Sequence, residues 1–510
     1  IREIEKTWGN LFDVDQFVAL PPPELNELEL NKSRINRIPE SLQSICRDDI
    51  YERALHTYGK TIVETSRAFA RDFSSAPDIV AYPQNPSDIR ALLDWCGETQ
   101  TAVIPFGGGS SAVMGVNPDI GDEFQGVVSV DMSDMNQVLE VDKESRSARV
   151  QAGVFGPHLD TQLKQHGLSM RFFMQAYNFS TLGGWVATRA AGHFVSTTTH
   201  IDDFVQSINM VTPEGPWESR RLPASGAGPS PDRFVMGSEG SLGIITDVWL
   251  KLPQNPTYRA GATVKFDDYA NGVSATREIS QAGLNPANCR LVDGNEASYT
   301  GAFKGSAAIL VLGFESAHHP VDSWLDLALQ ACRDNGGISV GDTPEGANAA
   351  ALWKKAFVRE PYFREVKTSR GIGRDTVETA VTWDNFSALH SKVMSKTHAA
   401  IKEVTGREGT VTCRFTHLYP DGPAPYFTFH FCCDPNQIAT TDMEIKTAAY
   451  DAMTDAGGTI THHHAIGRMH MPWYLKQRPE IFGRVLESAK AQVDPMGMMN
   501  PGVIVPLKSS

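Results

Sequence analysis

The sequence predicts an α+β protein with more than one domain. The chain has 510 residues, and a single hydrophobic core stops growing well before that length. Short apolar runs alternate with amphipathic stretches, as strands alternate with helices. This alternation is dense over residues 79–254 and restarts with longer helical stretches over residues 255–460. We therefore expect two α+β units, preceded by an N-terminal extension over residues 1–78 and followed by a C-terminal segment over residues 461–510.

Each part is predicted from its own pattern. Residues 1–78 are polar and helix-compatible, and they include an amphipathic run over residues 48–70, so we expect a helical extension. The second part opens with a short strand in "DIVAY". A helix capped by Ser87 after Pro86 follows, and then a strand over residues 101–106. This order of strand, helix, strand and glycine-rich turn indicates an α/β rhythm.

The third part begins with "GATVKFDDYANGVSATREIS", and its strands include "AAILVLGFES" and "APYFTFHFCC". Near its end the apolar and β-branched stretch Thr459 to Thr461 is predicted as an extended approach to three consecutive histidines, His462, His463 and His464. The chain ends with a helical stretch, "EIFGRVLESAKAQV", and a turn. We expect this last segment to return to the first domain and the active site.

Composition excludes several classes of protein. A formal net charge of −14 argues against nucleic-acid binding, which needs a surplus of cations. The seven cysteines are scattered without a CxxC pair, so we expect reduced thiols rather than a disulfide framework. No apolar run reaches the roughly 18 residues of a membrane span. No targeting signal is visible, so we expect a protein of the cytoplasm or an organelle lumen.

Three loops rich in glycine, serine and threonine adjoin predicted strands within one block of the chain. They read "PFGGGSSA" from Pro105, "NFSTLGGWVATRAAG" from Asn178 and "MGSEGSLGIIT" from Met236. Consecutive free amides in such loops can wrap an anion. One loop alone is equally well explained as a tight turn, but three together favour an extended dinucleotide.

These loops, in this order, resemble the FAD-binding domain of the vanillyl-alcohol oxidase / p-cresol methylhydroxylase (PCMH-type) superfamily. The later motifs "CRLVD", "EPYFREV", "VETAVTWDN", "CRFTHLYPDGPAPYFTF", "GGTITHHHAIG" and "VDPMGMMNPG" are similar to its alkyl-dihydroxyacetonephosphate synthase branch. The resemblance covers residues 50–502 and implies a PCMH-type domain with an α+β cap domain. It implies non-covalent FAD, since the first loop has no histidine for covalent attachment. Gln175-Ala176 and Ser110 depart from that branch, which commonly has Asp-Ser and Thr there.

The resemblance implies a set of flavin contacts in the three loops. They are Pro105, Phe106, Gly107, Gly108, Gly109, Ser110, Ser111, Gln175, Ser180, Thr181, Gly184, Thr188, Arg189, Ala190, Glu239, Gly240, Ser241, Leu242, Gly243, Ile244 and Ile245. It also implies a redox-neutral exchange. The acyloxy group of acyl-dihydroxyacetonephosphate leaves and a long-chain fatty alcohol replaces it. The resemblance implies a homodimer as well. Because one substrate is a long-chain alcohol, we expect peripheral membrane contact through an apolar patch near the active-site mouth, in the N-terminal extension.

In that reaction Arg364 and Arg290 bind the substrate, while Tyr426 and His462 to His464 are catalytic. Tyr426 can act as a base only if nearby positive charge, from an arginine or a protonated histidine, favours its ionised form. Histidines titrate near neutrality, so they could move the remaining protons. An arginine fork suits phosphate oxygens.

Other interpretations remain open. Arg364 and Arg290 could be salt-bridge residues, and Tyr426 could be a packing residue of its strand. Adjacent residues of an extended segment point to opposite faces, so at most His462 and His464 could share a metal ion, and we expect none. An FAD-dependent oxidoreductase acting on a 2-hydroxy acid or another alcohol is the main alternative. Its relatives carry Glu-His-Gly where this chain has His463-His464-Ala465. A degenerate flavin- or lipid-binding protein is a third reading.

Overall fold

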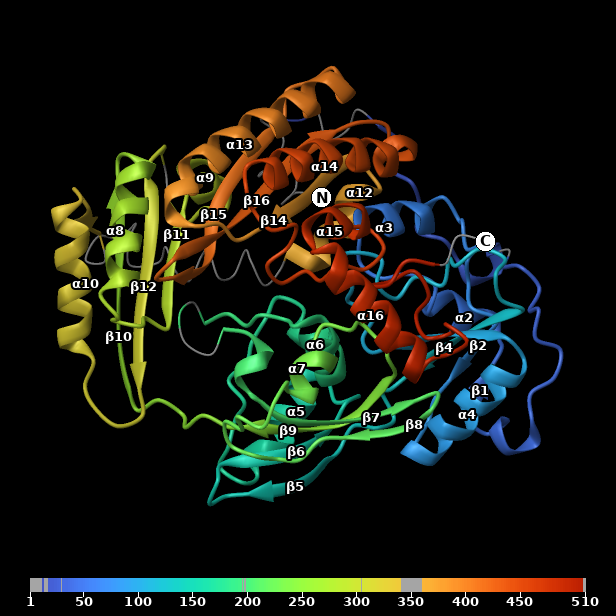
Figure 1. Cartoon of the computed structure of the whole chain (residues 1–510). Helices are drawn as coiled ribbons and strands as arrows, with labels where there is room; N and C mark the ends of the chain where they lie inside the picture. Colours follow the sequence, from blue (N-terminus) through green and yellow to red (C-terminus); the bar gives the residue numbers. More distant parts are fainter. Residues whose placement is uncertain are drawn as a thin grey trace.

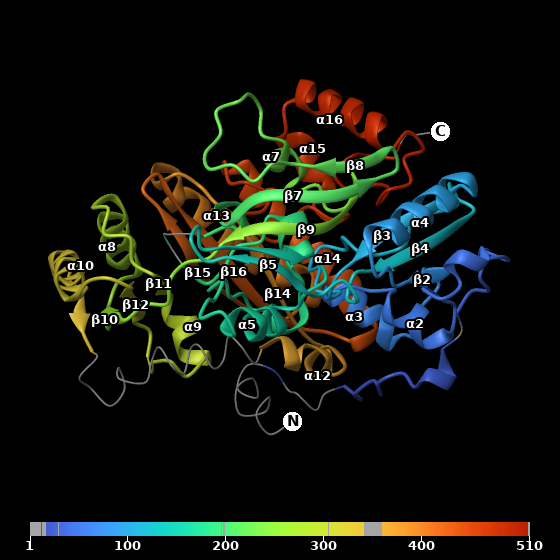
Figure 2. The same ribbon diagram turned by 90° about the horizontal axis from the view of Figure 1, so that it is seen from below.

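The computed structural model describes residues 12, 17–28, 30–194, 196, 199–303, 305–340 and 360–507. It contains three β-sheets with helices packed against them, which confirms the predicted α+β class. Two smaller sheets lie in the half of the molecule built from residues 46–251, and the largest sheet is built from residues 258–432. The two halves face one another, with the C-terminal helices along one side (Figures 1 and 2).

The first sheet has four strands in the order β1-β2-β4-β3. Their bounds are β1 Cys46–Arg47, β2 Ile79–Ala81, β4 Gly126–Asp131 and β3 Thr101–Phe106. Helix α4 (Pro86–Glu98) begins at Pro86, with Asn85 as its N-cap, so the predicted cap at Ser87 is wrong. The Asn85 side chain accepts the amides of Ser87 and Asp88. Proline suits the first helical position because it has no amide hydrogen to satisfy there.

The second sheet has five antiparallel strands in the order β5-β6-β9-β7-β8. They are β5 Val138–Asp142, β6 Ser147–Gln151, β9 Ile244–Lys251, β7 Val205–Thr212 and β8 Gly215–Glu218. Helices α5 (Gly156–Lys164), α6 (Leu182–Thr188) and α7 (Pro231–Val235) lie against it (Figure 1). The second glycine-rich loop is the start of α6, where Thr181 caps the helix by accepting the amide of Gly184.

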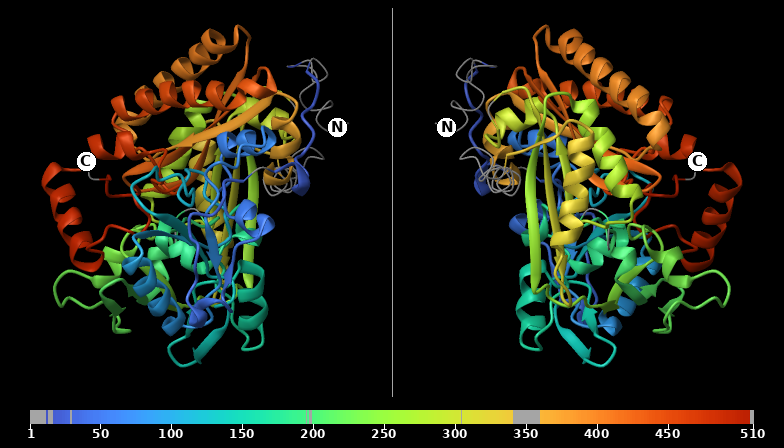
Figure 3. Two further views of the ribbon diagram at one scale, coloured as in Figure 1. Left: turned by 90° about the vertical axis from the view of Figure 1, so that its right-hand side faces the viewer. Right: turned by 90° about the vertical axis from the view of Figure 1, so that its left-hand side faces the viewer.

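The third sheet has seven strands in the order β13-β10-β12-β11-β15-β16-β14. They are β13 Ile338–Ser339, β10 Tyr258–Phe266, β12 Ala308–Ser316, β11 Asn288–Val292, β15 Thr410–Tyr419, β16 Gly422–Cys432 and β14 Ile372–Glu378. Its helices are α8 Tyr269–Gln281, α9 Gly294–Tyr299, α10 Asp322–Asp334, α12 Arg364–Thr368, α13 Trp383–Thr405 and α14 Ile438–Asp455. Helices α8 and α10 lie side by side at one end of the sheet, while α13 and α14 cover the other end (Figures 1 and 3).

The described part of the N-terminal region is not one long helix. Its amphipathic run holds two short helices, α2 (Ile50–Leu55) and α3 (Ile62–Phe69), separated by a turn. Asp49 caps the first by accepting the amide of Glu52, and Thr61 caps the second within a capping box. Strand β1 pairs with β2, so this region joins the first sheet directly. Residues 1–11 and 13–16 of the predicted extension lie outside the described residues.

The C-terminal segment contains helices α15 (Met471–Gln477) and α16 (Glu480–Val493). Helix α15 packs against α14 through Trp473, while α16 packs against the first half of the molecule. The buried ammonium of Lys490 donates to Asp494 Oδ2 and to the carbonyls of Ser241 and Met499, at 2.7, 2.7 and 2.8 Å. Asn500 donates to the carbonyls of Gly115 and Glu239. Among the helices of the described residues, none is both long and apolar enough to cross a bilayer.

Candidate active site

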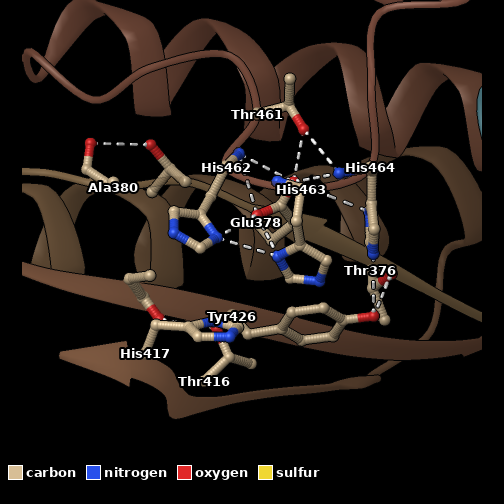
Figure 4. A network of polar contacts seen from close by, with 12 residues as sticks. Thr376, Glu378, Ala380, Thr416, His417, Tyr426, Thr461, His462, His463 and His464 are labelled. Atoms are coloured by element: carbon tan, nitrogen blue, oxygen red, sulfur yellow. Dashed lines mark hydrogen bonds and ion pairs between the residues drawn. The ribbon is translucent and has the colours of Figure 1, made fainter. Parts of the chain in front are cut away.

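The three histidines lie on a bent stretch of chain, residues 461–467, which we call the histidine segment. One buried carboxylate binds the backbone of these histidines. Glu378, at the end of β14, accepts the amides of His462, His463 and His464 at 2.9–3.0 Å, together with the hydroxyl of Thr461 (Figure 4). The predicted extended approach at Thr459 to Thr461 is therefore wrong. Successive amides that converge on one anion require a curved backbone rather than a pleated one.

A second buried carboxylate binds the next residues of this segment. Glu239, from the third glycine-rich loop, accepts the amides of Ile466 and Gly467 at 2.7 and 2.9 Å. Burial raises the pKa of Glu239 to about 7, although the two donated amides oppose that shift. Glu239 was expected to contact the flavin. Its side chain binds the C-terminal segment to the FAD-binding half, and its contact with the flavin stays a prediction.

Tyr426 lies on β16 beside the histidine segment. Its side chain is buried, and its hydroxyl lies 3.1 Å from Thr376 Oγ1 and 3.4 Å from His464 Nε2. The guanidinium of Arg414 lies over the ring, 4.1 Å from its centroid, and pairs with Glu296 at 2.8 Å. The ring of His463 stacks against Tyr426 with centroids 6.0 Å apart. The positive charge next to Tyr426 therefore comes from an arginine.

The buried rings are not suited to titrate near neutrality. Burial lowers the pKa of His464 to about 3, despite the opposing charge of Glu378. Burial also holds the pKa values of His462 and His417 well below the usual range. Burial disfavours ionisation of Glu378 as well, but the neighbouring His463, whose Nδ1 lies 3.2 Å from Oε2, holds its pKa well below the usual value. The expectation of histidines that titrate near pH 7 is wrong for His462 and His464.

A cavity of about 630 Å³ connects this cluster with the glycine-rich loops. That volume is in the range of pockets that enclose small ligands. The first two loops pack tightly, since a Cβ on Gly108 would meet the Phe179 carbonyl oxygen at 2.0 Å. Within the described residues, the amides of Gly107 to Ser110 donate no hydrogen bond. A strand of free amides beside a cavity fits the diphosphate of FAD.

The structure brings most of the predicted site residues to this one cavity. Those that line it are Gly107, Gly108, Gly109, Ser110, Ser111, Gln175, Ser180, Thr181, Gly184, Thr188, Ala190, Arg290, Arg364, Tyr426, His463 and His464. His462 does not line it, because its ring turns toward Tyr419, whose hydroxyl lies 2.8 Å from Nε2. Pro105, Phe106 and Arg189 do not line it either, and Arg189 pairs instead with Asp202 at 2.8 Å.

The third glycine-rich loop supports the first loop rather than the cavity. None of its predicted flavin contacts lines the cavity, and these are Glu239, Gly240, Ser241, Leu242, Gly243, Ile244 and Ile245. Gly240 has a φ of +77°, and a Cβ there would meet the Pro105 ring at 2.7 Å. Glycine is thus required because the loop packs directly behind the first loop in a left-handed conformation.

Cationic side chains gather at the cap-domain end of the cavity. Arg290, Arg364, Arg374, Arg414 and Lys446 all line it. Three of them have carboxylate partners: Arg414 pairs with Glu296, Lys446 with Asp375 at 2.7 Å, and Arg374 lies 3.4 Å from Glu360. Arg290 donates toward His193 Nδ1 at 3.2 Å, and burial lowers its pKa to about 9. This end of the cavity suits an anionic group.

Sequence reasoning did not single out Glu378, Arg414, His417 or Lys446. Glu378, Arg414 and His417 lie inside the quoted motifs "VETAVTWDN" and "CRFTHLYPDGPAPYFTF". The signal that was available is a charged or imidazole side chain within a strand of otherwise apolar and hydroxyl residues. Such residues are buried only when partnered. Lys446 is one polar residue of a long helix and carried no comparable signal.

The fold and cavity define a class of FAD-dependent enzyme. Residues 77–219 match the family described as FAD binding domain, and residues 255–504 match the family described as FAD linked oxidases, C-terminal domain. The chain belongs to the PCMH-type superfamily of FAD-dependent enzymes. The structure of p-cresol methylhydroxylase with substrate bound has the same fold, with a TM-score of 0.70 at 14% identity over 92% of this chain and 95% of that one.

Within this superfamily the chain is similar to alkyldihydroxyacetonephosphate synthases. It is 28% identical to the enzyme of that name from Dictyostelium discoideum over 515 residues, which covers 96% of this chain and 82% of the relative. A solved structure of alkyldihydroxyacetonephosphate synthase superposes with a TM-score of 0.81. That comparison has 25% identity and covers 98% of this chain and 90% of the other. The resemblance on which the sequence analysis relied is thereby confirmed.

We predict that Glu378→Gln destabilises the histidine segment. An amide cannot replace a carboxylate that accepts three backbone amides, so the loss should be roughly 3 kcal/mol of unfolding free energy. The folded-state pKa of Glu378 is lowered, so its stabilisation is complete above the unfolded pKa of about 4.3 and is lost as the pH falls through the folded value. Thermal melts should thus show a difference in melting temperature between wild type and variant. This difference should be constant near neutrality and become smaller below about pH 4.

The control is Glu444→Gln, because Glu444 is an exposed carboxylate on α14. It should melt like the wild type. A Glu378→Gln protein as stable as Glu444→Gln at pH 7 would contradict the role assigned to this carboxylate.

Proposed function

We propose that the protein makes an ether lipid precursor by a redox-neutral exchange. The bond between carbon 1 and the acyloxy oxygen of acyl-dihydroxyacetonephosphate breaks, and carbon 1 forms a bond to the oxygen of a long-chain fatty alcohol. The alcohol's hydroxyl proton ends on the departing fatty acid, so atoms and electrons balance without an external oxidant. This assignment agrees with the relatives named alkyldihydroxyacetonephosphate synthase.

The observation that carries the proposal is the placement of Tyr426. Its hydroxyl lies between Thr376 and His464, and Arg414 lies over its ring. Tyr426 lines the cavity, and the first two glycine-rich loops line the same cavity. Exchange at carbon 1 needs a base close to that carbon. The guanidinium of Arg414 places a positive charge against the ring of this tyrosine. His464 is neutral, because burial disfavours its protonation, so its Nε2 can share a hydrogen bond with the hydroxyl.

Arg364 and Arg290 are proposed to bind the substrate phosphate. Both line the cavity, and Arg364 begins the short helix α12. Guanidinium forks bind phosphate oxygens through two parallel hydrogen bonds. A dianionic phosphate held here places the three-carbon unit between the arginines and the loops. Carbon 1 would then face Tyr426.

FAD is the cofactor, and the free amides of Gly107 to Ser110 and the start of α6 would hold it. When bound, it supplies an electron sink for carbon 1 during exchange. The protein's own residues bind the phosphate, exclude water, and take up and return a proton at the Tyr426 hydroxyl. A side chain that removes a proton from the substrate must lie within hydrogen-bond reach of that proton. Tyr426 lines the cavity, so a substrate bound there can come within that reach.

The first prediction for this function is a comparison of substrates. Acyl-dihydroxyacetonephosphate and hexadecanol should give an alkyl ether and a free fatty acid in equal amounts, as measured by mass spectrometry. D-lactate and D-2-hydroxyglutarate should leave the oxidised flavin absorbance unchanged without oxygen. Rapid bleaching by a hydroxy acid, with no ether formed, would assign the protein to the oxidoreductase alternative.

The second prediction concerns Tyr426→Phe, which keeps the ring and removes only the hydroxyl. Ether synthesis should fall by about 10²- to 10⁴-fold, the usual contribution of a general base, while flavin content stays unchanged. The control is Tyr258→Phe, since Tyr258 is an exposed tyrosine of β10 far along the same sheet. Wild-type turnover by Tyr426→Phe would exclude this tyrosine from the chemistry.

We also propose peripheral contact with a membrane, since a long-chain alcohol resides in one. Near the cavity, Tyr362 and Val366 are 58% and 39% exposed. Helix α2 lies on the same side of the molecule as α12 (Figures 2 and 3), and its Ile50, Tyr51 and Leu55 are exposed. Apolar side chains gathered on one face suit shallow insertion into the lipid headgroup region.

Flotation with phosphatidylcholine vesicles tests this contact. The wild type should float at both low and high salt, because apolar insertion is not screened, and Ile50→Ser with Leu55→Ser should stay at the bottom. The matched control is Ile481→Ser with Val485→Ser, since α16 exposes these residues on the opposite face (Figure 2). Equal flotation of both double variants would contradict the assignment. The homodimer implied by the resemblance stays a prediction, which light scattering of the same samples would check.

A further inference from the structure

Three imidazole rings converge where the histidine segment meets β15. His417, His462 and His463 each offer a ring nitrogen, and these nitrogens lie within 4.8 Å of one another. Nδ1 of His462 lies 3.0 Å from Nδ1 of His463. The two residues are adjacent in the chain, so the argument that only His462 and His464 could share an ion is wrong. It assumed a strand, whereas Glu378 bends this backbone.

His417 carries the second observation. Its ring is 2% exposed, and its Nε2 lies 2.9 Å from the carbonyl oxygen of Gly192, so Nε2 bears the hydrogen and Nδ1 keeps its lone pair. Within the described residues, Nδ1 has no hydrogen-bond partner. A buried acceptor without a donor costs about 1–3 kcal/mol. Figure 4 shows the His417 ring lying beneath the rings of His462 and His463.

The surroundings of these rings match those of metal ligands. A ligating histidine usually donates its other ring nitrogen to a carbonyl, hydroxyl or carboxylate, which fixes its orientation. His417 does so to Gly192, and Nε2 of His462 lies 2.8 Å from the hydroxyl of Tyr419. Glu378 Oε2, 3.2 Å from Nδ1 of His463, supplies negative charge close to an ion.

We propose that His417, His462 and His463 bind a divalent transition metal of the zinc type. Neutral imidazoles are preferred by zinc, cobalt and copper rather than by magnesium or calcium. Three protein ligands leave one position of a tetrahedral ion open. His417 and His463 line the cavity, so that position faces the substrate space and admits an oxygen ligand. The metal site stands independently of the proposed reaction.

The experiment uses full-length holoprotein without a polyhistidine tag, freed of metal with a chelator and dialysed against Zn²⁺ alone. Elemental analysis should find one zinc per chain. Co²⁺ in place of zinc should give the intense visible absorption of a tetrahedral ion. His417→Gln keeps an N–H that can reach Gly192 but loses the ligand nitrogen, and it should lose the zinc, as should His463→Ala. Tyr419→Phe should weaken zinc affinity by about 10- to 100-fold through loss of the partner of His462.

The matched control is His398→Ala, because His398 is an exposed histidine on α13. It should bind zinc like the wild type. A wild type that retains no zinc, or equal binding by His417→Gln, His463→Ala and His398→Ala, would overturn the proposal. Flavin content and circular dichroism identify a variant that fails to fold, and the second ligand variant then decides. Zinc binding without ether synthesis would leave this site in place and reject only the proposed function.

Discussion

The active site depends on two buried carboxylates that each bind successive backbone amides. Glu378 reaches the histidine segment from the cap-domain sheet, and Glu239 reaches it from the FAD-binding half. Hydrogen bonds to an ionised group contribute about 1.5–3 kcal/mol each, more than those between neutral groups. The segment is therefore fixed from both sides, and its imidazoles remain available to the cavity. The same contacts join the two halves of the molecule beside the cavity.

Burial determines which side chains around the cavity carry a charge. Charged groups persist in the interior only when paired, so Arg414 is matched by Glu296 and Lys446 by Asp375. The described histidines His462, His464 and His417 are neutral for the same reason, because each would otherwise be a buried cation. The arginines at the cap-domain end of the cavity therefore supply the net positive charge that would bind a phosphate. Proton transfer is left to neutral rings and hydroxyls around Tyr426.

The sequence predicted those features that depend on local pattern. Strand β3 has the predicted bounds, and the first two glycine-rich loops both line one cavity. It failed where a distant residue decides the local conformation. Nothing near Thr461 indicates that a glutamate more than 80 positions earlier bends the histidine segment out of a strand. The sequence could not predict that these histidines are neutral either, because their burial depends on how the two halves of the molecule come together. Residues of the third loop were predicted from their glycines, but their packing against Pro105 requires the fold.

Because backbone amides hold the histidine segment, the effect of a substitution on structure can be distinguished from its effect on chemistry. Where side chains hold a loop in place, replacing a catalytic side chain disturbs the loop and the measured loss mixes two effects. Here the amides of His462, His463 and His464 carry the structural contacts, and any residue except proline supplies such an amide. A ring can therefore be removed while its neighbours keep their positions. Losses measured at these positions report what each imidazole does, whether it meets a proton, a substrate oxygen or a metal ion.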